Sequence, residues 1–314
     1  VEIVGSNATF TFNAGTTIED FGGTSFHVDG GTPNITMNGD ITNSSGVAVH
    51  IENTTGGTKT FGGDITHTSA ANRSVHIEAN TGGSVNFNAS STITDTGQGM
   101  LVENNTGGSY SFLGTNDLDP VAAATEAVLV NNNTGANITF AGLNINTATG
   151  STTQGFVATG GGTLSVTGTT NEINTENGTG LRLENMTIGS VDFRSVTVDG
   201  NTGPANAIVL NTLTGGQVEI GTTTGAQNSG GMLRTTGDAI VVTNAQNVAL
   251  RDIQILSAGG RGVVVTHNTS ATTNSDVTVD GLNLDASTLD GVSVTAASNA
   301  NSFVMRLINS DLEE

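Results

Sequence analysis

Short runs in which apolar and polar residues alternate recur along the whole chain. The runs at residues 47–57, 73–83 and 100–108 read VAVHIENTTGG, RSVHIEANTGG and MLVENNTGG. Segments of this kind return every ~26 residues and give about twelve copies. The copies begin near Val1, Gly23, Gly46, Asn72, Gly99, Glu126, Gly155, Gly180, Asn206, Asp238, Gly262 and Gly291. Alternation with a period of two residues indicates β-strands, because helices repeat about every 3.6 residues.

Each copy contains three such alternations separated by glycine-rich turns. Val49 and Ile51 face one side in the first alternation, Val85 and Phe87 do so in the second, and the third centres on residues such as Ile65. Strands of about four residues bury little by themselves, but copies stacked ~4.8 Å apart form three parallel sheets around one core. We therefore expect an all-β parallel solenoid of about 12 coils.

Stacking brings equivalent residues of successive copies together. The second alternation predicts an internal aromatic ladder of Phe61, Phe87, Phe112 and Phe140. The third predicts one inward column through Ile18, Ile41, Ile65, Ile93, Leu118, Ile145, Ile173, Val198, Ile255 and Leu284. The turns beginning at Asn53 and Asn80 indicate a corner at which glycine supplies positive φ and asparagines hydrogen-bond between coils.

With these repeats, the chain resembles the right-handed parallel β-helix repeat proteins, the pectate-lyase-like superfold. The resemblance is closest to the Gly-, Asn- and Thr-rich members found in large secreted or surface-attached bacterial proteins, and it covers residues 1–314. It implies one β-helix domain but no particular activity, because this fold serves lyases, hydrolases, phage tailspikes and adhesin stalks. The chain starts at Val1, so we expect a processed protein or a segment or subunit of a larger assembly.

Composition narrows the function classes. The 314 residues include 8 Lys and Arg, 28 Asp and Glu, no cysteine and no tryptophan, and the formal net charge is −20. The lack of cysteine excludes a disulfide scaffold and a cysteine nucleophile. An acidic chain with few bases repels nucleic acid, and no apolar run reaches the ~18 to 20 residues of a transmembrane helix. We expect an extracellular or cell-surface protein.

The outward positions of the first strand suggest a metal site. One column contains His27, His50 and His76, and a second column two residues further on contains Asp29, Glu52, Glu78 and Glu103. Carboxylates ~4.8 Å apart repel one another and recruit a cation. Imidazoles suit a borderline metal, whereas oxygen ligands alone suit Ca²⁺. Two other interpretations stay open: a solvated polar stripe and a pH-sensitive contact surface.

The same outward column becomes apolar further along the chain. Apart from Arg182, it contains the candidate interface residues Leu101, Leu129, Val157, Val209, Val241 and Val264. A contiguous apolar patch is rarely left in contact with water. We expect either a covering loop or a lateral partner.

Catalysis has a weaker basis. The most suggestive cluster is Asp192, Arg194 and Asp199, whose alternative interpretation is ordinary surface charge on successive strands. It would serve a polysaccharide lyase or glycoside hydrolase of this fold. Residues 222–237 form the best candidate for a groove wall by their length. Lys59 falls at an inward position, which predicts a local register shift because an unpaired buried charge is costly.

The preferred functional hypothesis is therefore a non-catalytic structural or adhesive rod. We expect it to belong to a surface appendage, matrix fibre or large adhesin, and to require no cofactor. Because a solenoid exposes a coil at each end, head-to-tail self-association is one expected mode of contact. Other surface or matrix proteins, or carbohydrate, are the alternative partners.

Overall fold

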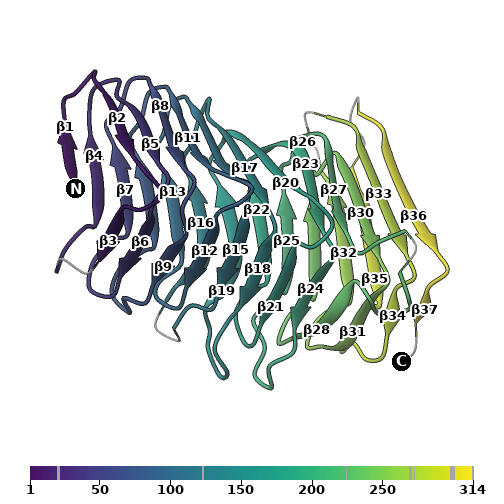
Figure 1. Ribbon diagram of the computed structural model, residues 1–314. Helices are drawn as coiled ribbons and strands as arrows, with labels where there is room; N and C mark the ends of the chain where they lie inside the picture. The colour runs from purple at the N-terminus through teal and green to yellow at the C-terminus, as the bar shows by residue number, and fades with distance from the viewer. Residues whose placement is uncertain are drawn as a thin grey trace.

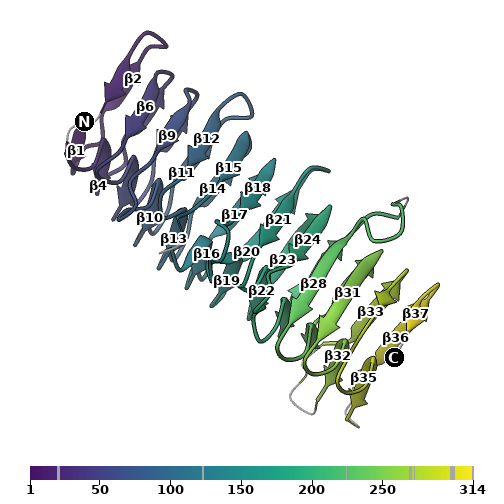
Figure 2. The same cartoon turned by 90° about the horizontal axis from the view of Figure 1, so that it is seen from below.

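The computed structural model describes residues 1–19, 22–121, 124–223, 225–268, 271, 273–297 and 301–312. Within these residues every regular element is a strand, and the strands form three sheets (Figure 1). All strand pairs are parallel and join each coil to the next, so the chain is a parallel β-solenoid of about 12 coils, as predicted. Figure 2 shows the coils stepping along one axis from the N-terminus to the C-terminus.

Sheet A contains the first strand of every coil. Its 12 strands, in spatial order, are β1 (Glu2–Val4), β4 (Phe26–Asp29), β7 (Val49–Glu52), β10 (Val75–Glu78), β13 (Met100–Glu103), β16 (Glu126–Asn131), β19 (Gln154–Thr159), β22 (Leu181–Glu184), β25 (Ile208–Asn211), β29 (Ile240–Thr243), β32 (Val263–His267) and β35 (Val292–Ala296). The predicted register is confirmed, because His27 pairs with His50 and His50 pairs with His76.

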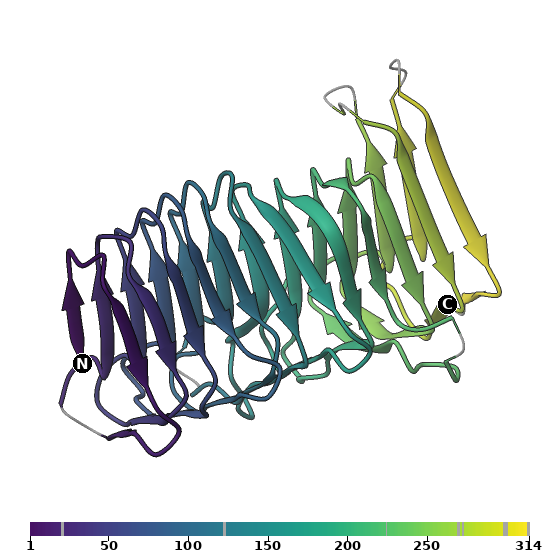
Figure 3. The ribbon, with the colours of Figure 1, turned by 45° about the horizontal axis from the view of Figure 1, so that its top comes forward.

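Sheet B contains the second strand of every coil. Its main path is β2 (Thr9–Phe12), β5 (Asn34–Met37), β8 (Thr58–Phe61), β11 (Ser84–Phe87), β14 (Ser109–Phe112), β17 (Asn137–Ala141), β20 (Thr163–Thr167), β23 (Thr187–Phe193), β27 (Gln217–Ile220), β30 (Asn247–Arg251), β33 (Ser275–Asp280) and β36 (Phe303–Ile308). The two-residue β26 (Thr214–Gly215) also pairs with β23. Figure 3 shows these strands side by side along the stack.

Sheet C closes each coil. Its 12 strands are β3 (Thr17–Glu19), β6 (Asp40–Asn43), β9 (Ile65–His67), β12 (Thr92–Asp95), β15 (Thr115–Leu118), β18 (Leu143–Asn146), β21 (Glu172–Thr175), β24 (Ser195–Val198), β28 (Gly231–Thr235), β31 (Ile253–Ala258), β34 (Asn283–Leu284) and β37 (Asp311–Leu312). Since β28 takes up 231–235, the insertion expected at 222–237 is shorter and ends before this strand.

The single inward column predicted for sheet C is wrong in detail. Leu118 lies opposite Asp95, and Asn116 takes the position opposite Ile93. The cause is turn length: only residues 113–114 separate β14 from β15, whereas residues 88–91 separate β11 from β12. A shorter turn starts the next strand two residues earlier in the pattern, and this preserves which face each side chain occupies.

A polar pair also lies inside the solenoid, where β9 and β12 pair in the predicted register. His67 and Asp95 are both fully buried, and His67 Nδ1 lies 3.0 Å from Asp95 Oδ1. His67 Nε2 donates to the Gly46 carbonyl oxygen at 2.9 Å, and the Gly97 amide donates to Asp95 Oδ1 at 2.5 Å. These hydrogen bonds offset part of the cost of placing polar groups in the core, although Asp95 Oδ2 has no hydrogen-bond partner among the described residues.

The predicted aromatic ladder forms as expected. Consecutive rings of Phe61, Phe87, Phe112 and Phe140 have centroid separations of 4.9, 4.9 and 4.7 Å and interplanar angles of 15°, 8° and 6°. All four side chains are buried. The ladder ends where the Phe156 ring meets Phe140 edge-on. Identical residues in register thus stack ring on ring across hydrogen-bonded strands.

Asparagines form the expected ladder at the corner between sheets A and B, except that Thr54 lies opposite Asn80 and Asn53 lies one position earlier. Asn80 Nδ2 donates to Asn105 Oδ1 at 2.9 Å, and Asn105 Nδ2 donates to Asn133 Oδ1 at 2.7 Å. All three side chains are fully buried. The preceding residue in each coil has positive φ, as at Asn104 (56°) and Ala79 (54°). Asparagine tolerates this left-handed conformation better than other non-glycine residues, which explains its recurrence here.

The register shift predicted at Lys59 is wrong. Lys59 pairs in register with Val85 and Ile35, points inward and is fully buried. Its ammonium group reaches the corner and donates to the Gly56 carbonyl oxygen at 2.5 Å. Burial lowers the pKa of Lys59 from 10.5 to about 8. A long side chain with a polar tip can therefore occupy this column because a corner carbonyl lies within reach.

Candidate functional site

A stack of histidines lies on the outer face of sheet A. His27, His50 and His76 come from β4, β7 and β10, and they follow one another in register. The first two ring centroids are 5.0 Å apart and the next two are 4.7 Å apart, with interplanar angles of 15° and 8°. The strand spacing sets this separation, so the sheet itself orients the imidazoles.

Each imidazole bonds to a glutamate of the following coil. His27 Nε2 lies 2.8 Å from Glu52 Oε1, and His50 Nε2 lies 2.9 Å from Glu78 Oε1. Because a carboxylate only accepts hydrogen bonds, both Nε2 atoms act as donors in this arrangement. β7 and β10 both contain a histidine followed two residues later by a glutamate. The bond from His50 to Glu78 therefore repeats, one coil further on, the bond from His27 to Glu52.

The third step of the stack is looser. His76 Nε2 lies 3.4 Å from Glu103 Oε1 and 3.6 Å from Glu78 Oε1. Burial lowers the pKa of His76, and the positive charge of His50 lowers it further, whereas Glu78 and Glu103 act in the opposite direction. Desolvation disfavours the charged imidazolium, so the neutral, metal-binding form of this ring is favoured.

Five side chains of the predicted metal set converge. Ligand atoms of His27, His50 and Glu52 lie within 4.8 Å of one another, and so do those of His50, His76 and Glu78. We call these five residues the His–Glu ladder. Of the other two predicted ligands, Asp29 accepts a hydrogen bond from Asn53 Nδ2 at 2.9 Å, and Glu103 contacts only the end of the ladder at His76.

The candidate interface column follows the ladder on the same face. Leu101 pairs with His76 and Leu129, and the register continues through Val157 and Val264 as predicted. Val157 and Val264 are only 6% and 8% exposed. The remaining members, Leu101, Leu129, Val209 and Val241, are half-buried. A lateral partner for this column stays a prediction.

The candidate catalytic residues do not line one pocket. Asp192 lies on sheet B, where burial and the nearby Glu219 raise its pKa. Arg194 forms an ion pair with Glu172. Asp199 follows β24 and lines a groove on sheet C that neither Asp192 nor Arg194 borders. Asp192 and Asp199 therefore lie on different sheets, because a corner lies between β23 and β24, whereas Arg194 contacts Glu172, which lines the same groove as Asp199.

The sheet C groove is polar and measures about 530 Å³. Asp117 and Asp119 lie at one end and Asp199 lies at the other. Burial and the charge of Asp117 raise the pKa of Asp119. Asn144 Nδ2 donates to Asp117 Oδ1 at 2.7 Å, so amides and carboxylates alternate between neighbouring coils.

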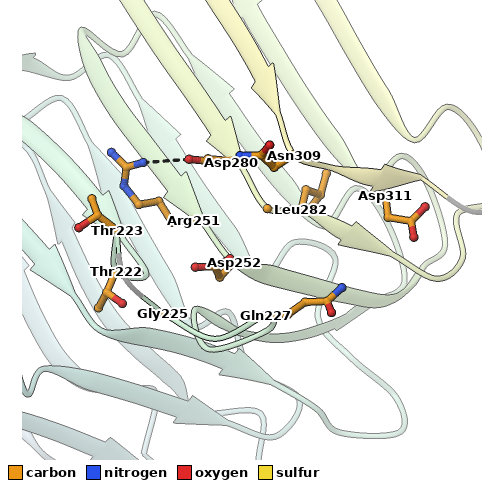
Figure 4. Close-up of a pocket in the computed structure, with 11 residues that line it drawn as sticks. Thr222, Thr223, Gly225, Gln227, Arg251, Asp252, Asp280, Leu282, Asn309 and Asp311 are labelled. Atoms are coloured by element: carbon orange, nitrogen blue, oxygen red, sulfur yellow. Dashed lines mark hydrogen bonds and ion pairs between the residues drawn. The ribbon is translucent and has the colours of Figure 1, made fainter.

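A second polar pocket of about 360 Å³ lies near the C-terminal end of the stack, bordered by the insertion after β27 (Figure 4). Arg251 bridges Glu219 and Asp280, with closest distances of 2.8 and 3.4 Å. Burial and the charge of Asp280 raise the pKa of Asp252, while Arg251 lowers it. Sequence reasoning identified the insertion but missed these acids, whose only signal is their position at the ends of neighbouring strands.

Comparisons with protein-family models, with curated proteins and with solved structures found no match to this chain. Among the described residues, no helix has the length and hydropathy needed to cross a membrane. The functional argument therefore starts from the geometry of this solenoid.

Proposed function

We propose that the chain is a non-catalytic structural or adhesive β-solenoid, a rod-like unit of an extracellular surface appendage, matrix fibre or large adhesin. The supporting observation is the continuous stacking of all three sheets, in which every coil hydrogen-bonds to the next. Aromatic, asparagine and His–Glu ladders reinforce this stack from coil to coil. A long, regular body with repeated cross-coil bonds is suited to spanning distance and bearing load.

The last coil supplies a surface for association. Val294, Leu307 and Leu312 are 46%, 44% and 43% exposed, although they pair with the buried residues Val265, Val279 and Leu284 of the core columns. One residue comes from each sheet, so together they form the end face of the core. Strand edges with unpaired backbone groups and apolar side chains pair readily with further strands.

We propose that this end face joins the next unit of the rod by continuing the three sheets. A second copy of the chain would pair its first coil with the last coil of its neighbour. Such head-to-tail contacts do not close on themselves and generate filaments. Twelve coils at the usual spacing correspond to an axial repeat of roughly 55 to 60 Å.

Electron microscopy of the purified chain over a range of micromolar concentrations tests this proposal. We expect filaments with the stated axial repeat. Leu307→Lys places a charge on the end face and should abolish filaments, because charged edge residues oppose strand addition. Ile308→Lys is the matched control: Ile308 lies next to Leu307, is 40% exposed and pairs with Asp280, outside the core columns.

Two results would overturn the proposal. One is a population of single rods that does not change with concentration. The other is cleavage of an acidic or neutral polysaccharide that Asp192→Ala or Asp199→Ala removes, since this would identify a lyase or glycoside hydrolase.

A further inference from the structure

The His–Glu ladder places a carboxylate between each pair of successive imidazoles. Glu52 Oε1 lies 2.8 Å from His27 Nε2 and 3.9 Å from His50 Nδ1. Glu78 Oε1 lies 2.9 Å from His50 Nε2 and 3.6 Å from His76 Nε2. His50 Nδ1 therefore faces the group that contains Glu52 and His27, whereas His50 Nε2 faces the group that contains Glu78 and His76.

We propose that these five side chains form two overlapping sites, each with two histidines and one glutamate, that bind a divalent transition-metal ion of the zinc class. Two imidazole nitrogens and one carboxylate oxygen form a donor set that zinc prefers and that calcium, which takes oxygen ligands, does not. Calcium, the alternative suggested by the carboxylates alone, is the competing ion in the test below.

The geometry requires only small side-chain movements. The ligand atoms of each group already lie within 4.8 Å of one another. Zinc bonds of about 2.0 to 2.1 Å bring such atoms to roughly 3.4 Å apart in a tetrahedral site. Rotation of the imidazoles and carboxylates about their side-chain bonds supplies the difference, while the strands stay paired.

The surroundings favour a cation. The ladder side chains are between 17% and 27% exposed, so they are shielded but open to solvent on one side. Stacking at 5.0 and 4.7 Å fixes the ring planes and reduces the entropy lost on binding. Three protein ligands leave a fourth coordination position facing solvent, where water completes the tetrahedron.

Sharing of His50 limits the number of bound ions. A neutral imidazole has one lone pair, so His50 can coordinate one ion at a time. The ladder therefore binds one ion per chain at neutral pH, through either group of ligands. This proposal is independent of filament formation.

Isothermal titration calorimetry of the chelator-treated chain with zinc chloride at pH 7.5 tests the assignment. We expect one ion per chain. His50→Ala removes a ligand from both groups and should weaken binding about a hundredfold or more. His27→Ala and His76→Ala each leave one group complete and should retain one ion. Asp64→Asn, a charge change in the turn just before β9 of sheet C, is the control and should not alter binding.

A gain-of-function variant makes the test sharper. Leu101 follows His76 in the same column, and Glu103 follows Glu78. Leu101→His would add a third group, formed with His76 and Glu103, that shares no residue with the first. We expect this variant to bind two zinc ions per chain. In combination with His50→Ala it should restore one ion.

Circular dichroism of each variant verifies that the sheets remain folded. Absence of zinc binding at millimolar concentration overturns the proposal, and so does unchanged binding in folded His50→Ala. Calcium binding that is as tight as zinc binding and insensitive to His50→Ala also overturns it, because the donors would then be carboxylates alone.

Discussion

At the residue scale, individual side chains depart from the repeat where an unusual backbone or polar partner accommodates them. Lys59 occupies a core column because its ammonium group bonds to the corner carbonyl of Gly56. Tyr110, in the same column two coils further on, donates its hydroxyl to the Gly107 carbonyl oxygen at 2.7 Å, and burial raises its pKa. Inward polar residues are therefore compatible with this column when the side chain is long enough to reach the turn.

Replacing Lys59 with methionine should stabilise the fold at pH 7. The pKa of about 8 in the folded protein, against 10.5 for the ordinary group, means that protonated Lys59 costs about 3 kcal/mol of unfolding free energy. The folded state releases its proton first, so the cost diminishes as pH rises from about 8 to 10.5. Urea unfolding at pH 7 and pH 10 checks this. An equal gain at both pH values would contradict the expectation.

The corner residue Ala79 offers a second change. Its φ of 54° is left-handed, whereas the equivalent residues in the adjoining coils are Asn53 and Asn104. Ala79→Asn should raise the free energy of unfolding by about 0.5 to 1 kcal/mol, because asparagine tolerates this conformation better. Chemical denaturation measures the change. Ala48→Asn, at a fully buried position, should instead destabilise the protein.

At the scale of elements, each sheet is held by ladders that couple one strand to the next. The asparagine ladder connects turns whose backbone groups would otherwise be buried without partners. Asn105 accepts from the Asn80 amide at 2.9 Å, donates to the Ile77 carbonyl oxygen at 3.2 Å and donates to Asn133. Removal of the Asn105 side chain therefore breaks hydrogen bonds that connect three successive coils.

Asn105→Ala should lower the free energy of unfolding by about 2 to 4 kcal/mol, because it leaves several buried polar groups unsatisfied. Asn86→Ala is a suitable comparison, since the half-buried Asn86 forms only a long bond of 3.5 Å to Ser84. That change should cost less than about 0.5 kcal/mol. Urea unfolding of both variants checks the difference, and equal losses would argue against the ladder's role.

At the scale of the whole molecule, charge accumulates along a narrow body. The net charge is −20, and carboxylates lie close together in places, as where the charge of Asp117 raises the pKa of Asp119. Their mutual repulsion opposes the compact stack and is screened by salt.

The melting temperature should rise by several degrees between about 10 mM and 500 mM sodium chloride as the Debye length shortens. The double variant Asp117→Asn and Asp119→Asn, which removes two of these charges, should show a smaller rise in melting temperature. Differential scanning fluorimetry over a salt series measures it. A melting temperature that is constant or falls with salt would show that repulsion does not limit stability.

The sequence by itself determined the number of coils, the three strands of each coil, the register of sheet A and most of the residues that face the core. It did so because alternation fixes the face of each side chain and a regular repeat stacks equivalent residues, such as Phe87 on Phe112. It also located the histidines and glutamates on one outer face. In sheet B it predicted a register shift at Lys59 that is absent and did not predict the shift between β20 and β23.

Only the tertiary structure decided which atoms meet. The bond from His50 to the glutamate of the next coil, the corner partner of Lys59 and the offset of Leu118 all depend on turn lengths and side-chain rotation. These contacts join residues three to 28 positions apart in sequence. Periodicity gives the column in which a residue lies, whereas the geometry of the turns fixes what its side chain can reach.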